Sequence, residues 1–143
     1  METIALRFAD KFASEEGTIM AHQEVIQQLG YVWFGKIGAP ISYRSAETIL
    51  KNKSPRILLI QSGKNGRYWA YVDKIIWEKP DAFAIPQYYR NNTDNVHTWF
   101  RVTRIIEADK SILSKCTVVS SGAVLSMTSM HSMNSFFIIH VDV

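Results

Sequence analysis

The pattern of apolar and polar positions along the chain predicts six β-strands and three helices. The six stretches with strand-like alternation or strand-forming composition are residues 3–8, 31–37, 56–61, 67–78, 97–106 and 136–141. Apolar side chains at helical spacing predict a helix over residues 18–29, which Gly30 ends. Shorter helices are expected over residues 46–51, with Ser45 as N-cap, and over residues 123–127. These elements predict an α+β fold built around a small curved β-sheet or barrel with short peripheral helices.

Residues 56–78 are the best-defined local unit, a β-hairpin whose turn spans residues 62–66. Strict alternation on the returning strand predicts two apolar faces, one with Tyr68, Ala70, Val72 and Ile76 and the other with Trp69, Tyr71, Ile75 and Trp77. The same rule places Arg101 and Arg104 on opposite faces of the next strand. Between these strands, residues 80–95 form the longest irregular segment, and long loops often carry function.

Length and composition indicate one ordinary globular domain. The chain has 143 residues, of which 47% are hydrophobic and 20% charged, which is unlike a disordered chain. We expect one domain over residues 1–143, in which residues 1–30 form an N-terminal extension packed on the barrel. No apolar run reaches the roughly 18 residues that cross a bilayer, and residues 1–10 lack a signal-peptide pattern, so the expected location is cytoplasmic, without membrane contact. Cys116 is the single cysteine, which excludes an intrachain disulfide and a cysteine-based zinc site.

Five short motifs, taken in their order along the chain, resemble the PUA-like superfamily. They are Val32-Trp33-Phe34-Gly35-Lys36, the Leu-Leu-Ile-Gln-Ser-Gly run at residues 58–63, residues 70–75, Trp99-Phe100-Arg101-Val102, and the serine-containing residues 129–133. The likeness runs from about residue 31 to the C-terminus and is nearer to the EVE and YTH branch than to the ASCH branch. The Trp-Asp-Gly-Val-Arg-Asn stretch of EVE domains is absent, and a short helix is predicted in its place. The resemblance implies a compact barrel whose cleft takes up a nucleobase, often a modified one, usually without chemistry of its own.

A base-binding cleft needs aromatic rings, short polar groups on rigid elements and diffuse positive charge for the phosphate backbone. The candidates for the cleft are Trp33, Phe34, Lys36, Gln61, Ser62, Trp99, Ser129 and Ser132. The candidates for backbone contacts are Arg44, Lys64, Arg67 and Arg90, in a chain of formal net charge +3. Core packing, turn chemistry and solvated surface charge are the alternative roles of these rings, serines and cations. The expected function is uptake of a single-stranded or flipped base of RNA or DNA, modified or unmodified, without catalysis and without a cofactor.

Other functions stay open at this point. An ASCH-like hydrolase or nuclease acting on nucleosides or RNA would need a lysine and a carboxylate in one cleft, and Lys36 with Glu47 or Asp73 is the pair that the sequence offers. The ligand of the cleft is alternatively a free nucleotide. A protein-interaction module would dock its partner through the helix at residues 18–29, and the N-terminal strand and helix would also serve as the edge of a homodimer. The histidines lack metal-ligand spacing, so no metal site is expected.

Overall fold

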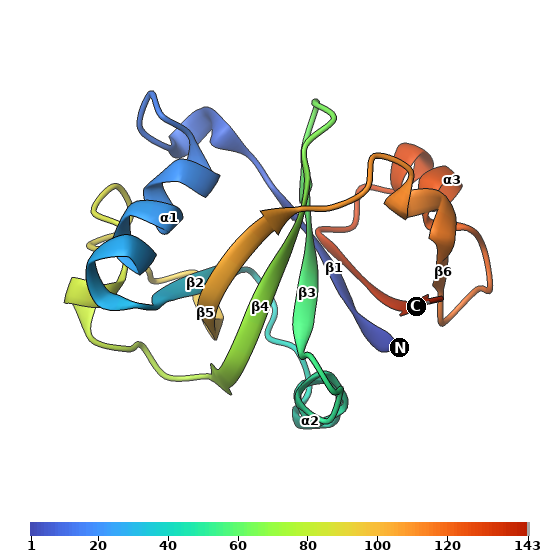
Figure 1. The fold of residues 1–143 in the computed structure, drawn as a ribbon, viewed down its shortest axis with the longest axis horizontal. Coiled ribbons are helices and arrows are strands. Elements are labelled where there is room, and N and C mark those ends of the chain that lie inside the picture. The colour runs from blue at the N-terminus through green and yellow to red at the C-terminus, as the bar shows by residue number, and fades with distance from the viewer. Residues whose placement is uncertain (143) are drawn as a thin grey trace.

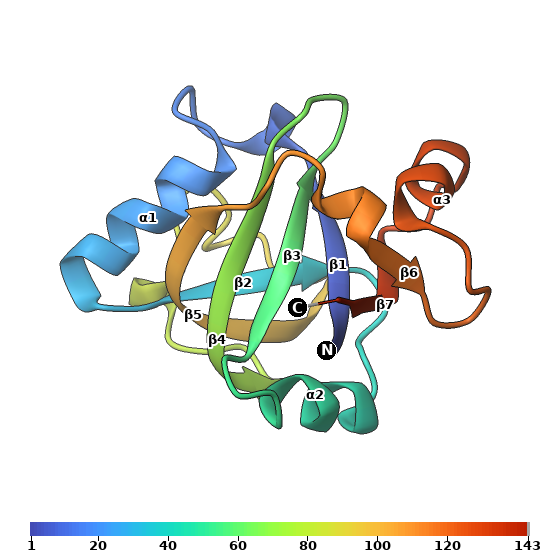
Figure 2. The same ribbon diagram turned by 45° about the vertical axis from the view of Figure 1, so that its right-hand side comes forward.

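In a computed structural model, residues 1–142 form a seven-stranded mixed sheet with three helices, so the predicted α+β fold is confirmed. The strands are β1 (Glu2–Phe8), β2 (Val32–Ile37), β3 (Arg56–Gln61), β4 (Arg67–Ile76), β5 (Val96–Glu107), β6 (Cys116–Val118) and β7 (Phe136–Val141). The helices are α1 (Thr18–Leu29), α2 (Tyr43–Leu50) and α3 (Leu125–His131). The strand order is β2-β5-β4-β3-β1-β7-β6, and Figures 1 and 2 show the sheet strongly curved.

The position of β1 differs from the expected N-terminal extension, because β1 lies inside the sheet. It pairs in parallel with β3, where Ala5 faces Leu58, and antiparallel with β7, where Ile4 faces Ile138. The crossover that a parallel pair requires is supplied by α1, β2 and α2. The sequence pattern did not reveal this because β7, one partner of β1, comes from the other end of the chain.

The two faces of the sheet are covered differently. The face that packs against α1 and α2, here called the inner face, carries residues such as Leu59, Val72 and Phe100. On the opposite or outer face, Leu58 and Trp69 pack under α3, β6, β7 and the segment that follows β5. A separate part of the outer face, around Trp33 and Trp99, is covered by residues 82–89. Figure 1 shows α1 and α3 on opposite sides of the molecule.

Irregular pairing between β4 and β5 overturns the strict alternation predicted for these strands. The register shifts on both sides of Val72, so that Tyr71 faces Arg104 while Lys74 faces Arg101. An extra residue in a strand turns every later side chain to the other face. Ile75 therefore joins Val72 in the inner core. For the same reason Arg101 and Arg104, predicted on opposite faces, both lie on the outer face.

Three local predictions also need correction. The N-cap of α2 is Ser42, whose side chain accepts a hydrogen bond of 3.0 Å from the backbone N–H of Ser45, so the helix begins before the expected residue 46. Helix α3 begins at Leu125 and extends to His131, beyond the predicted residues 123–127. Strand β6 was not predicted, because three residues are too few for an alternation pattern.

Candidate nucleic-acid interface

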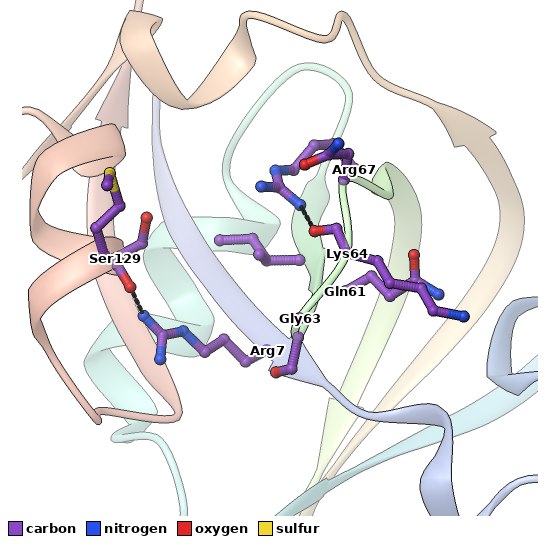
Figure 3. Close-up of a pocket in the computed structure, with 10 residues that line it drawn as sticks. Arg7, Gln61, Gly63, Lys64, Arg67 and Ser129 are labelled. Atoms are coloured by element: carbon purple, nitrogen blue, oxygen red, sulfur yellow. Dashed lines mark hydrogen bonds between the residues drawn. The ribbon is translucent and has the colours of Figure 1, made fainter.

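One pocket collects five of the residues that the sequence singled out. It has a volume of about 250 Å³ and lies between the β3–β4 turn, the end of β1 and α3 (Figure 3). The predicted residues on its walls are Gln61, Ser62, Lys64, Arg67 and Ser129. The other wall residues are Arg7, Ile60, Gly63, Asn65 and Met130. The chain thus brings polar and basic groups from three separate elements together at one end of the sheet.

The pocket walls carry three cations, Arg7, Lys64 and Arg67, and no carboxylate. Both guanidinium groups lie on the α3 side of the β3–β4 turn, whereas the Lys64 side chain extends to the other side (Figure 3). Asp10 attracts Lys64 electrostatically, whereas Arg7 and Arg67 meet no carboxylate on the pocket walls. Positive groups attract an anion, and a guanidinium offers two parallel N–H groups to a phosphate. The pocket is therefore suited to a phosphate-bearing ligand.

Backbone carbonyls hold the two guanidinium groups in place. Arg7 Nη2 donates to the carbonyl oxygen of Ser129, and the Arg7 guanidinium lies 5.5 Å from the centre of the Phe137 ring. Arg67 Nη1 donates to the carbonyls of Lys64 at 3.1 Å and Gly66 at 2.9 Å. Partial burial lowers the pKa of Arg67 from its usual value, but a guanidinium remains charged in proteins. Each arginine has five N–H groups, so donors remain for a ligand.

Gln61 is fixed at the floor of the turn by Asp10. Its Nε2 donates to Asp10 Oδ2 at 2.6 Å, and a Cβ added to Gly66 would lie only 2.5 Å from its Oε1. Burial alone raises the pKa of Asp10, but hydrogen bonds from Thr18 and Gln61 outweigh it and lower the pKa overall. Asp10 therefore stays ionised and orients the amide, whose oxygen points away from that carboxylate and can accept a hydrogen bond.

The three aromatic candidates lie away from this pocket. Trp99 is fully buried, and its ring is parallel to that of Tyr89 at a centroid distance of 6.3 Å. Trp33 packs in the same outer cluster, while Phe34 belongs to the inner core next to His22. These rings serve as core packing, and the aromatic part of the expected cleft is not assembled with its serine part.

Lys36 is a buried lysine inside the fold. Its ammonium group lies 4.4 Å from the centre of the Phe136 ring and donates to the carbonyls of Ala39 and Ile37. Burial lowers the pKa of Lys36 from its usual value. The carboxylates of the hydrolase alternative are engaged elsewhere, because Glu47 pairs with Lys51 at 2.6 Å and Asp73 lies 3.8 Å from Arg101. The lysine–carboxylate pair of that alternative is therefore not formed.

The remaining candidates are spread over other surfaces. Ser132 ends α3, and its hydroxyl accepts a 3.2 Å hydrogen bond from the Asn134 backbone N–H. Arg44 is exposed on α2. Arg90 lies in the loop before β5 and donates to the carbonyl of Ile85 at 2.9 Å. None of the three lines the pocket.

Among the wall residues that sequence reasoning did not select, Arg7 and Met130 lie outside the predicted hairpin. Arg7 is the one cation in β1 and stands between the apolar Leu6 and Phe8, a signal that was available, but β1 was expected at the periphery. Met130 is 75% exposed on α3 and gives the pocket an apolar wall. Exposed methionines on a short helix carry no chemical motif in the sequence, so only the three-dimensional arrangement identifies this residue.

The fold and the pocket define a class of protein, a small curved-sheet α+β domain with a cationic pocket at one end. The family model described as Pua-like matches residues 4–139, and the chain belongs to this family. The match includes β1 and α1, which the sequence motifs had left outside the resemblance. No curated protein and no solved structure matches the chain. Within residues 1–142, no helix is long and apolar enough to cross a membrane, and no group of three or more His, Cys, Asp or Glu side chains is placed to hold a metal ion.

Proposed function

We propose that the protein binds single-stranded nucleic acid at the pocket between the β3–β4 turn and α3, which we call the Arg7 pocket. The observation that carries this proposal is that the guanidinium groups of Arg7 and Arg67 line this pocket together with Lys64, with no carboxylate on its walls. Membership of the Pua-like family supports an RNA-binding type of module. The motifs favour the EVE and YTH branch within that family, and this finer assignment is part of the proposal.

The pocket offers separate groups for the phosphate and the base. Arg7, Lys64 and Arg67 supply charge to the phosphates, which sets affinity. The Gln61 amide and the Ser62 hydroxyl are short polar groups of the kind that hydrogen-bond to base edges. The exposed Met130 side chain provides an apolar, polarisable surface against which the flat face of a base packs. Comparing oligonucleotides with and without modified bases tests whether the pocket prefers a modified base.

The size of the pocket favours a polymer over a free nucleotide as ligand. Its volume of about 250 Å³ is below the roughly 300–1,000 Å³ of typical small-molecule pockets. Such a space holds one base or one phosphate group and leaves the rest of the ligand outside. A polymer gains affinity from contacts beyond the pocket, which a free nucleotide does not make.

The test is fluorescence anisotropy with labelled single-stranded RNA and DNA of six nucleotides, with and without modified bases, at two salt concentrations. The double variant Arg7→Gln/Lys64→Gln removes two pocket charges, and we expect its affinity to fall about tenfold or more and its salt dependence to weaken. Arg44→Gln, on α2, is the matched control because it removes a cation outside the pocket. Circular dichroism verifies that each variant is folded. Equal affinity in the pocket variant and the control contradicts the proposal.

A further inference from the structure

The outer face of the sheet carries a row of arginine, tyrosine and arginine across three adjacent strands. Arg56 on β3 faces Tyr71 on β4, and Tyr71 faces Arg104 on β5. The Arg104 guanidinium lies 4.2 Å from the centre of the Tyr71 ring, and that of Arg56 lies 5.7 Å from it. Contact with a ring orients a guanidinium and leaves N–H groups at its edge for a phosphate. One N–H group of Arg56 is already used, since Nη1 donates to the Ser54 carbonyl at 3.1 Å.

A second row follows along the same face. Lys74 on β4 faces Arg101 on β5, which in turn faces Trp33 on β2. The Arg101 guanidinium lies 4.4 Å from the centre of the Tyr31 ring. These residues line a cavity of about 340 Å³, to which Lys79 adds a further cation. The register shift in β4 and β5 is the reason that both rows are on one face, since strict alternation would have separated Arg101 from Arg104.

Positive charge dominates this strip, which we define as the two rows with Lys79. Its five cations are Arg56, Lys74, Lys79, Arg101 and Arg104. Two carboxylates are near them. Asp73 lies 3.8 Å from Arg101, and Asp81 lines the cavity. Cations therefore outnumber carboxylates, and the strip favours a polyanion that runs along β4.

The strip and the Arg7 pocket lie along the same strand. Arg67 begins β4 and lines the pocket, and Lys74 follows seven residues later in the second row. At about 3.3 Å per strand residue, the two positions are roughly 20 Å apart. In Figure 2, β4 runs from the β3–β4 turn at the top of the molecule to the level of α2 at the bottom. A single-stranded nucleic acid that reaches from the Arg7 pocket to the second row would be several nucleotides long, within the range of about 4–16 nucleotides that single-strand binding folds cover.

We propose that the strip binds the sugar–phosphate backbone of the nucleic-acid strand that enters the Arg7 pocket, an inference that rests on the proposed function. The pocket then holds one end of the strand, and the strip adds length-dependent, sequence-independent affinity through its guanidinium and ammonium groups. The bound polymer is the single strand of the proposed function, and the strip contacts its phosphates because guanidinium groups lie against the Tyr71 and Tyr31 rings.

The experiment compares single-stranded RNAs of 4 and 16 nucleotides, with the same repeated base, by fluorescence anisotropy over a range of salt concentrations. The strip variant is Lys74→Gln/Arg104→Gln, the pocket variant is Arg7→Gln/Lys64→Gln, and Arg44→Gln is the matched control. We expect the strip variant to bind the 16-mer about tenfold more weakly, with a salt slope smaller by about 1.4, because each lost phosphate contact on a single strand contributes about 0.7. Its affinity for the 4-mer stays equal to that of the control.

The outcomes separate the strip from the pocket. A strip variant that binds the 16-mer as tightly as the control overturns the proposal for the strip. If the pocket variant binds both RNAs more weakly in the same experiment, the proposed function of the Arg7 pocket still stands. Failure of the unmodified protein to bind either RNA overturns the proposed function and the strip together. Arg104→Lys keeps the charge but loses the planar group over Tyr71, so partial loss with the 16-mer supports the stacked geometry. Thermal unfolding of each variant verifies that the sheet is intact.

Discussion

His22 joins three parts of the chain at the scale of a single residue. Its Nδ1 lies 2.7 Å from the Thr18 carbonyl within α1, so this nitrogen carries the proton of the neutral ring. Its unprotonated Nε2 lies 3.0 Å from the Tyr89 hydroxyl, and the oxygen of that hydroxyl accepts a 3.2 Å hydrogen bond from the Gly35 backbone N–H of β2. The ring thereby ties α1 and β2 to the long loop before β5. Complete burial lowers the pKa of His22 to about 4.

The buried His22 predicts a loss of stability in mild acid. In the unfolded chain its pKa is about 6.5, so between pH 6.5 and 4 the unfolded state binds a proton that the native state does not. The contribution of the neutral His22 ring to the free energy of unfolding is therefore fully present above pH 6.5 and decreases as the pH falls. We expect the free energy of unfolding in urea to fall by about 2 kcal/mol between pH 7 and pH 5. The variant His22→Gln has no titrating ring and should show a smaller change over the same range, and parallel pH profiles would refute this assignment.

At the scale of the element, the start of α2 depends on one serine. The Ser42 hydroxyl accepts the hydrogen bond from the Ser45 N–H, which otherwise has no partner within the helix. We expect Ser42→Ala to lower the free energy of unfolding by about 1 kcal/mol. Ser45→Ala is the comparison variant, because it keeps the capped backbone N–H and loses only the exposed hydroxyl that accepts a 3.0 Å hydrogen bond from the Ser42 hydroxyl. The free energies of unfolding are measured by urea unfolding. An equal decrease in the two variants would show that Ser42 is not the cap.

Elements were predicted well where one segment carries its own pattern. The bounds of α1, β3 and β7 agree with the sequence prediction, and Gly30 adopts the left-handed conformation that ends α1, at φ 85°. The faces of β4 and β5 could not be predicted beyond Val72, because an irregular register depends on two strands together. The error affected function directly, since it separated Arg101 from Arg104.

At the scale of the whole molecule, β1 determines whether the sheet can form. Ile4 and Leu6 lie in the inner core while Ala5 lies in the outer core, so both faces of the strand are covered. We expect a chain of residues 31–143 to lack a cooperative thermal transition. This shorter chain has no β1, so β3 and β7 lose the strand that lies between them. Circular dichroism and an amide NMR spectrum, compared with the full chain, measure this. A native-like spectrum from the shorter chain would show β1 to be dispensable.

The candidate site was predictable in its polar half. Gln61 ends β3, and Ser62 and Lys64 follow it in the hairpin turn, which the sequence pattern predicts. Arg7 and Ser129 come from segments more than one hundred residues apart, and only the place of β1 in the sheet brings them together. The rings were misplaced for a different reason. Aromatic residues fill cores as readily as they line clefts, and burial decides between the two.

The two backbone hydrogen bonds between residues 1 and 141 have a mechanical consequence. Val141 N–H donates to the Met1 carbonyl at 2.7 Å, and the Met1 amine donates to the Val141 carbonyl at 2.9 Å. Because β1 and β7 are antiparallel, tension applied at these two residues loads their hydrogen bonds one after another, as in a zipper, and never all at once. A protein-unfolding enzyme that pulls on the C-terminal end would therefore detach β7 from β1 at low force. It would then unfold α3, a wall of the Arg7 pocket, before it disturbs the central strands.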